Sequence, residues 1–287
     1  MSQHGSPKSL SQKAVGVDAI NRYLSAQSDF AFEMEILQIV KKQCSGQTSW
    51  GGSYYDIKTG KQREYDIRTE LPASRSRIDD WLELAIECKN IGENYPLVIS
   101  CTKRDRSEQK IDSWRWPMSH SHKGVEPMIQ LGTFYRRHTH NLWRDDEFIG
   151  RALDQVGEDS KGDLVFGDED IFNKWSQALN STCGILHDAL DRRNPDRWLN
   201  LVFLPAVVVP NGTLWQVRYD DTGKIIGVPK PVDYLPYWIG NEYEISLMDR
   251  AENYKIYELN FFTQNGLIDF LNNKKLHESF FCDNPNS

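Results

Sequence analysis

The sequence has no apolar run near the roughly 18–20 residues that a membrane-spanning helix needs. Its first sixteen residues, MSQHGSPKSLSQKAVG, lack the apolar stretch of a secretory signal. Its five cysteines are scattered without a CxxC spacing, which argues against a disulfide framework or a cysteine-based zinc site. Internal repeats and low-complexity tracts are also absent. These absences favour a cytoplasmic chain that works without a membrane.

The 287 residues carry a net charge of −7, which argues against a generic polyanion binder. The charge is unevenly spread, however. Residues 103–144 hold nine Lys or Arg against four Asp or Glu, whereas residues 145–170 hold two against ten. With 39% hydrophobic residues and 11% aromatic residues, the chain can bury a sizeable core. We therefore expect one large domain, or one domain with an insertion.

Apolar periodicity and turn residues predict an α/β fold with the order helix, three strands, helix, strand. The predicted segments are, in that order, 28–44, 47–56, 62–70, 80–89, 170–190 and 198–209. Ser28 or Asp29 can cap the first helix. The second helix is expected to bury the stripe Phe172, Trp175, Leu179, Cys183, Leu186 and Leu190. A short strand at 95–101, hairpin turns at 211–212 and 220–223, a strand at 254–262 and a closing helix at 266–276 complete the prediction.

The strand at 80–89 ends in two charges that lie on one face. Side chains alternate along a strand, so Leu82, Leu84, Ile86 and Cys88 share an apolar face and Trp81, Glu83, Ala85, Glu87 and Lys89 share the other. One interpretation is a solvated face with an ordinary ion pair between Glu87 and Lys89. The other interpretation involves Asp66, which the preceding strand brings close to Glu87. Two close carboxylates repel unless a cation lies between them, and Mg²⁺ suits such oxygen ligands.

Glu33 falls within the apolar stripe of the first predicted helix, between Phe30 and Leu37, whereas Glu35 points nearly opposite. A carboxylate on a buried face is costly without a partner. Glu33 therefore either forms a salt bridge with an arginine or faces the same cleft as Asp66 and Glu87.

This arrangement resembles the PD-(D/E)xK phosphodiesterase superfamily, which has the restriction-endonuclease-like fold: Glu33 on a first helix, Asp66 on a second strand, then Glu87-Cys88-Lys89. The resemblance covers about half the chain. It implies that Asp66 and Glu87 bind Mg²⁺, with Mn²⁺ as a substitute, and that the Cys88 carbonyl is a further ligand. It also implies that Lys89 acts on the nucleophilic water and that Glu33 supports a metal-bound water. Three features depart from the family pattern. Tyr65 stands where the motif has proline, and about eighty residues separate Lys89 from the second core helix. The predicted strand at 95–101 directly follows the motif, where a helix would be expected.

The resemblance predicts an N-terminal extension (1–27), a nuclease core (28–210) with an insertion at about 90–169, and a C-terminal β/α extension (211–287) packed on the core. It implies an Mg²⁺-dependent endonuclease that hydrolyses DNA, such as the effector subunit of a bacterial defence, restriction or transposition system. A protein partner would then supply target recognition or activation. Whether the chain forms a homodimer is left open.

The basic block within the predicted insertion mixes Lys and Arg with aromatic residues, a composition that suits phosphates and exposed bases. Its candidate DNA contacts are Lys103, Arg104, Arg136 and Arg137. Alternatively, the aromatic residues belong to the core and the charges are solvated. The rival functions are a non-catalytic nucleic-acid-binding subunit on the same fold, an RNA nuclease, and a structural α/β protein without a site.

Overall fold

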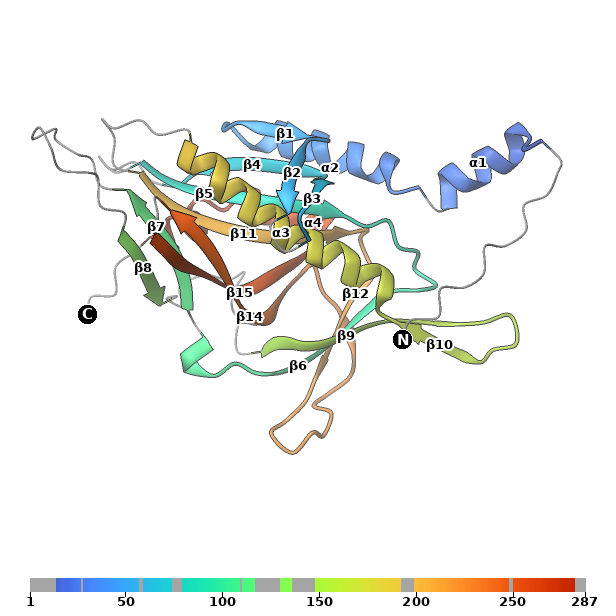
Figure 1. The fold of residues 1–287 in the computed structure, drawn as a ribbon. Helices are drawn as coiled ribbons and strands as arrows, with labels where there is room; N and C mark the ends of the chain where they lie inside the picture. Colours follow the sequence, from blue (N-terminus) through green and yellow to red (C-terminus); the bar gives the residue numbers. More distant parts are fainter. Residues whose placement is uncertain are drawn as a thin grey trace, which may run out of the picture.

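A computed structural model describes residues 14–26, 28–56, 59–73, 79–108, 110–116, 130–135, 148–191, 199–247 and 250–281. It is a mixed α/β protein with a large, mostly antiparallel sheet and few helices (Figure 1). The helices are α1 (Val17–Ala26), α2 (Phe30–Gln43), α3 (Glu169–Asp191), α4 (Gln264–Asn272) and α5 (Lys274–Ser279), with a 3-10 turn at Arg106–Glu108. None of the described helices is long and apolar enough to cross a membrane.

Thirteen strands form the main sheet. Its central path is β1 (Thr48–Trp50), β4 (Ile67–Pro72), β5 (Asp79–Cys88), β11 (Leu199–Val209), β15 (Arg250–Thr263), β14 (Tyr234–Leu247), β9 (Phe148–Glu158), β6 (Leu97–Lys103), β12 (Leu214–Arg218) and β13 (Lys230–Pro231). Beside this path, β10 (Leu164–Gly167) pairs with β9, and β7 (Lys110–Trp116) pairs with β11 and β8 (Gln130–Tyr135). The strands of the predicted insertion and C-terminal extension therefore continue the sheet that contains β4, β5 and β11.

Both faces of the central strands are covered, because β11 alternates between two cores. Val202, Leu204, Ala206 and Val208 of β11 pack with α2, α4 and α5. Val207 and Val209 belong to the opposite core, which includes α3 (Figure 1). Consequently Glu83, Ala85 and Glu87 of β5 are buried beneath α3. The solvated face that one interpretation of the sequence allowed for this strand is wrong.

Two of the strands predicted as continuous are broken. The segment 47–56 divides into β1 and β2 (Ser53–Asp56), and the segment 62–70 divides into β3 (Lys61–Glu64) and β4. β2 and β3 pair with each other in a separate ribbon. The chain turns at Gly51, whose positive φ of 60° is unfavourable for other residues. Asp66 therefore lies in the bend between β3 and β4, not within a strand as expected.

Helix α3 is rotated relative to the predicted stripe. Phe172 is 48% exposed, whereas Ile171 and Ala178 are fully buried. Leu179 and Cys183 are buried as expected. Phe30 of α2 was also expected on the buried stripe but is 57% exposed.

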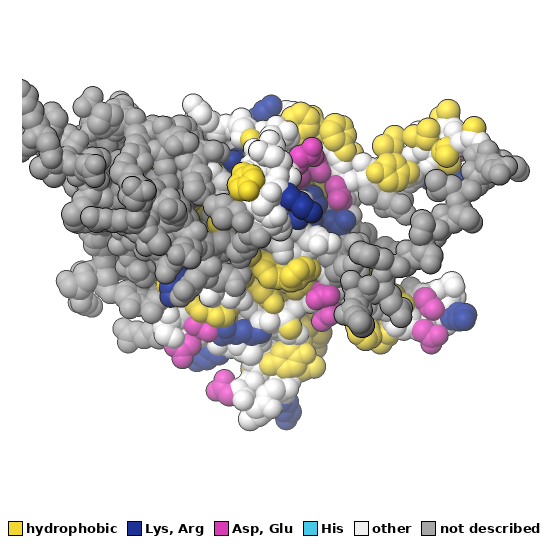
Figure 2. Space-filling model, in the orientation of Figure 1, with side chains coloured by type: hydrophobic (Ala, Val, Ile, Leu, Met, Phe, Trp, Pro, Cys, Tyr) yellow, Lys and Arg dark blue, Asp and Glu magenta, His cyan; other side chains and the backbone are white. Residues whose placement is uncertain are grey.

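Helix α1 stands away from the sheet (Figure 1). Several of its apolar side chains are exposed, as the space-filling view shows (Figure 2): Val17, Ile20, Tyr23 and Leu24.

Candidate functional site

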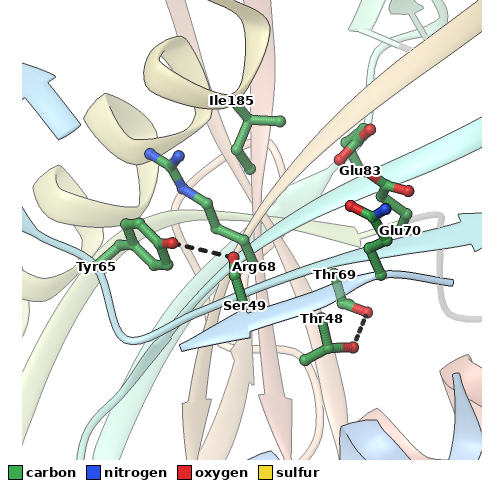
Figure 3. Close-up of a pocket in the computed structure, with 9 residues that line it drawn as sticks. Thr48, Ser49, Tyr65, Arg68, Thr69, Glu70, Glu83 and Ile185 are labelled. Atoms are coloured by element: carbon green, nitrogen blue, oxygen red, sulfur yellow. Dashed lines mark hydrogen bonds between the residues drawn. The ribbon is translucent and has the colours of Figure 1, made fainter. Parts of the chain in front are cut away.

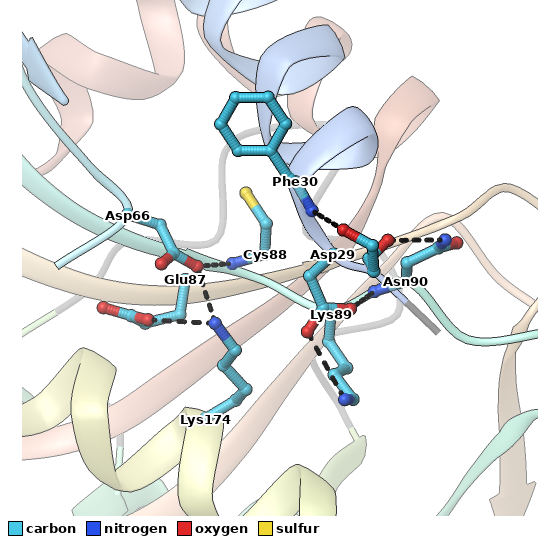
Figure 4. Close-up of polar contacts among 9 residues, drawn as sticks. Asp29, Phe30, Asp66, Glu87, Cys88, Lys89, Asn90 and Lys174 are labelled. Atoms are coloured by element: carbon cyan, nitrogen blue, oxygen red, sulfur yellow. Dashed lines mark hydrogen bonds and ion pairs between the residues drawn. The ribbon is translucent and has the colours of Figure 1, made fainter. Parts of the chain in front are cut away.

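Asp66 and Glu87 come together where β4 begins and β5 ends. Antiparallel pairing sets Ile67 opposite Ile86, so the next residues outward, Asp66 and Glu87, are neighbours across the two strands. The backbone N–H of Cys88 donates to Asp66 Oδ2 over 2.8 Å and fixes this carboxylate at the strand end (Figure 4). The proximity that the sequence predicted is thus present, although Asp66 lies just outside its strand.

Glu87 is the more deeply buried of these two acids, with 1% of its surface exposed. Neither of its carboxylate oxygens has a hydrogen-bond partner among the described residues. Burial, followed by the charge of Asp66, raises the pKa of Glu87 well above its usual range. If both carboxyl groups were ionised, their mutual repulsion and the burial of Glu87 would be costly. Binding of either a proton or a cation would lower that cost.

Lys174 of α3 supplies the positive charge nearest to this pair. Its Nζ lies 2.9 Å from Asp66 Oδ2 and 3.6 Å from Glu87 Oε2 (Figure 4). Burial alone would lower the pKa of Lys174, but the charges of Asp66 and Glu87 more than offset burial and raise it. The sequence prediction missed this residue. The sequence spacing could have indicated it. Lys174 lies three residues after Ile171 and four before Ala178, so it shares a helix face with these two residues, both of which are buried.

Glu33 lies in the first turn of α2, close enough to Asp66 and Lys174 for their charges to act on it. Burial, then the charge of Asp66, raises its pKa to about 7, while Lys174 acts in the opposite direction. Glu35 is exposed and accepts a hydrogen bond from Gln264 Nε2 over 3.0 Å. The helix therefore distinguishes the two glutamates as its periodicity predicted. We use the name acidic cluster for Glu33, Asp66 and Glu87.

Lys89 does not contact the acidic cluster through any ion pair among the described residues. It follows the last residue of β5, and its Nζ lies 3.4 Å from Asp29 Oδ2. The other oxygen of Asp29 accepts the backbone N–H of Asn90 over 2.8 Å (Figure 4). Because Asp29 is engaged in this way, its side chain does not cap α2. The Glu87–Lys89 ion pair that one interpretation of the sequence allowed is thus replaced by a pairing of Lys89 with Asp29.

The donor atoms of the acidic cluster fit a hard divalent cation in part. Among the described ranges, no three His, Cys, Asp or Glu side chains form a group that could hold a metal ion by itself. Mg²⁺ typically takes one or two carboxylates and completes its shell with waters and substrate phosphates. Asp66 and Glu87, whose carboxylate oxygens lack a hydrogen-bond donor among the described residues, meet that smaller requirement. Cys88 contributes its N–H to Asp66, and its side chain is buried in the apolar core.

The candidate nucleic-acid contacts differ in their surroundings. Lys103 is exposed at the end of β6. Arg104 is buried, and its Nη1 donates to Glu258 Oε1 over 2.7 Å, so this guanidinium does not belong to an exposed basic surface. Arg136 and Arg137 lie outside the described residues.

A polar cavity of about 210 Å³ opens beside β1, on the face of the sheet that α3 covers (Figure 3). Its lining consists of Gln47, Thr48, Ser49, Tyr65, Arg68, Thr69, Glu70, Glu83 and Ile185. The guanidinium of Arg68 lies 4.0 Å from the centre of the Tyr65 ring, and its Nε donates to Ser181 Oγ of α3 over 3.2 Å. These contacts tie β4 to α3 between the cavity and Lys174, and so fix the helix over the acidic cluster.

Comparison of the chain with protein-family models finds no match. Comparison with curated proteins finds none either, nor does comparison with solved structures. The geometry of the acidic cluster is therefore the basis for inferring a function.

Proposed function

We propose that this protein is a metal-dependent endonuclease that hydrolyses phosphodiester bonds of DNA at the acidic cluster. The observation that carries the proposal is the Asp66–Glu87 pair. Two carboxylates meet at adjoining strand ends, and both oxygens of Glu87 are buried without a hydrogen-bond donor among the described residues. Such a pair is unfavourable in a purely structural role and favourable when it holds a cation.

The arrangement of the central elements supports the proposed restriction-endonuclease-like core. α2 precedes the antiparallel strands β1, β4 and β5. α3 then leads into β11, which runs parallel to β5. This order agrees with the one that the family resemblance implies. The resemblance is also the basis for proposing an effector subunit of a defence, restriction or transposition system, with a protein partner that selects the target.

Asp66 and Glu87 would hold Mg²⁺, or Mn²⁺ in its place. The bound ion would supply Lewis-acid polarisation of the phosphate and a lowered pKa for the attacking water. The Cys88 N–H keeps Asp66 oriented toward Glu87, as its 2.8 Å hydrogen bond indicates.

Glu33, in the first turn of α2, would support a metal-bound water, the role that the family resemblance implies for it. As the water oxygen bonds to phosphorus, the bond from phosphorus to the leaving sugar oxygen breaks, and that oxygen takes up the proton that the water releases. Lys89 and Lys174 are the two lysines beside the cluster that can stabilise the developing negative charge. Asp29 holds Lys89 at the end of β5 for this role.

The test incubates the purified full chain and Mg²⁺ with supercoiled plasmid, single-stranded DNA and RNA of matched length. We expect DNA cleavage that chelator abolishes and that Asp66→Asn lowers by at least about 10²-fold. The matched control is Glu35→Gln, which changes an exposed glutamate of the same helix as Glu33 and should cut at the wild-type rate.

Two results would replace the proposal. Binding of nucleic acid without cleavage of any substrate would favour the non-catalytic subunit. Cleavage of RNA alone would favour the RNA nuclease.

A further inference from the structure

The acidic cluster holds more carboxyl groups than basic side chains. Glu33, Asp66 and Glu87 contribute three carboxyl groups, and Lys174 is the only lysine or arginine for which an ion pair with any of them is found among the described side chains. A lysine in such surroundings can act as a permanent structural partner, or it can occupy a position that another cation takes later.

The position of the Lys174 ammonium favours the second role. It contacts one oxygen of Asp66 and one of Glu87 at the same time, at 2.9 Å and 3.6 Å. A divalent cation shared by these two carboxylates would need the same region between them. Two cations so close would repel strongly in a buried site, so they cannot both stay there.

We propose that Lys174 is a built-in counter-ion of the Asp66–Glu87 pair that a divalent cation displaces, and that the displaced ammonium then faces the phosphate of the substrate. This inference rests on the proposed function for its substrate, but the displacement itself concerns only the cation and the protein. In the metal-free protein, Lys174 thereby offsets the repulsion between Asp66 and Glu87. It also lowers the affinity of this pair for the divalent cation until the ion and the substrate are both present.

The surroundings of Lys174 allow such a movement. The side chain is half-buried on the second turn of α3, and its long stem has several rotatable bonds. The charge of Asp29 also acts on Lys174, and the charge of Lys174 acts on Glu33. A displaced ammonium therefore remains near negative charge and is not driven into an apolar environment.

The first experiment measures binding of Mn²⁺ to the full chain by titration calorimetry without nucleic acid. We expect Lys174→Met to bind Mn²⁺ at least about tenfold more tightly than the wild type, because the competing cation is gone. Lys224→Met is the control. It removes an exposed lysine that has no ion pair with Asp66 or Glu87 among the described residues, so its affinity should change much less. Equal or weaker binding in Lys174→Met overturns the inference, as does an absence of binding in both proteins.

A second measurement uses the wild-type protein and so does not depend on how the variant folds. Acetylation of individual lysines is followed by mass spectrometry with and without Mn²⁺. We expect Lys174 to react at least about threefold faster with the ion, whereas the exposed Lys224 should not change. An unchanged Lys174 rate overturns the inference.

The two proposals fail separately. Tighter binding in Lys174→Met together with no cleavage by the wild type would retain the counter-ion and reject the nuclease. Cleavage by the wild type together with unchanged affinity in Lys174→Met would do the reverse.

Discussion

Two regions of the same sheet bury charged side chains, and they do so differently. At the end of β6, Arg104 and Glu258 lie 2.7 Å apart with only 1% and 6% of their side chains exposed. This pair matches one positive charge with one negative charge. In the acidic cluster, Lys174 instead contacts two carboxyl groups, those of Asp66 and Glu87, and its charge also acts on a third, that of Glu33.

The difference separates a structural pair from a candidate binding site. Burying an ion pair is tolerable when its partners compensate each other. Burying a surplus of one sign raises the cost, and the protein responds by binding protons: the pKa values of Glu33 and Glu87 are both raised, chiefly by burial and then by Asp66. A stored surplus of negative charge is the property that a cation-binding site requires.

The largest expected effect comes from breaking the balanced pair. Arg104→Met leaves Glu258 buried without this partner and should lower the free energy of unfolding by about 3–5 kcal/mol. Urea denaturation in chelator measures the loss. The double variant Arg104→Met/Glu258→Leu should recover most of it, because no isolated charge remains. A single variant as stable as the wild type would contradict the structural role.

The opposite sign is expected for the acidic cluster. Glu87→Gln removes a charge that burial and Asp66 both oppose, so at pH 8 in chelator it should raise the melting temperature by about 2–4 °C, the shift given by about 1 kcal/mol. The same variant should lose the further stabilisation that Mg²⁺ gives the wild type. Thermal denaturation with and without Mg²⁺ measures both changes. If metal-free Glu87→Gln were less stable than the metal-free wild type, the negative charge of Glu87 would be compensated in the folded protein.

The smallest effect concerns pH. The pKa of Glu33 is about 7 in the folded protein and 4.5 in its unperturbed state, so the folded state holds a proton that the unfolded state has released. The stability contributed by this group is complete below pH 4.5 and is lost as the pH rises through 7. Metal-free protein should therefore lose less stability between pH 5.5 and 8 in Glu33→Gln than in the wild type. Glu35→Gln should keep the wild-type slope, and identical slopes in all three proteins would refute the shift.

The parts of the site that could be predicted depend on local geometry. Asp66 and the Cys88 N–H are 22 residues apart, at the adjoining ends of two consecutive antiparallel strands, so the pairing of β4 with β5 brings Asp66 close to Glu87. Helical periodicity was likewise sufficient to distinguish Glu33 from Glu35. Both inferences use the periodicity with which side chains point along a single strand or helix.

The parts that could not be predicted depend on packing between distant segments. Helix α3 carries apolar residues on two sides, with Phe172 on one side and Ile171 and Ala178 on the other. Only its contacts with the sheet decide that the second is buried and that Lys174 faces Asp66. The direction of Lys89 was unpredictable for a related reason, because it lies beyond β5, where strand alternation ends.

The large sheet was underestimated because its pairings are non-local. β6 pairs with β12, and β11 pairs with β15, in both cases parallel and far apart along the chain. Segments that read as an insertion and an extension thus occupy neighbouring positions in one sheet.

The same separation along the chain has a consequence during synthesis. The hairpin that brings Asp66 and Glu87 together is complete at the end of β5, whereas Lys174 lies 108 residues after Asp66. At a translation rate of roughly 5–20 residues per second, the lysine follows Glu87 by roughly 4–17 s. Hairpins form within about 1–10 μs, so the two acids can meet long before their counter-ion exists. The nascent chain must therefore hold this pair with a borrowed proton or cation, or leave the hairpin open until α3 has been made.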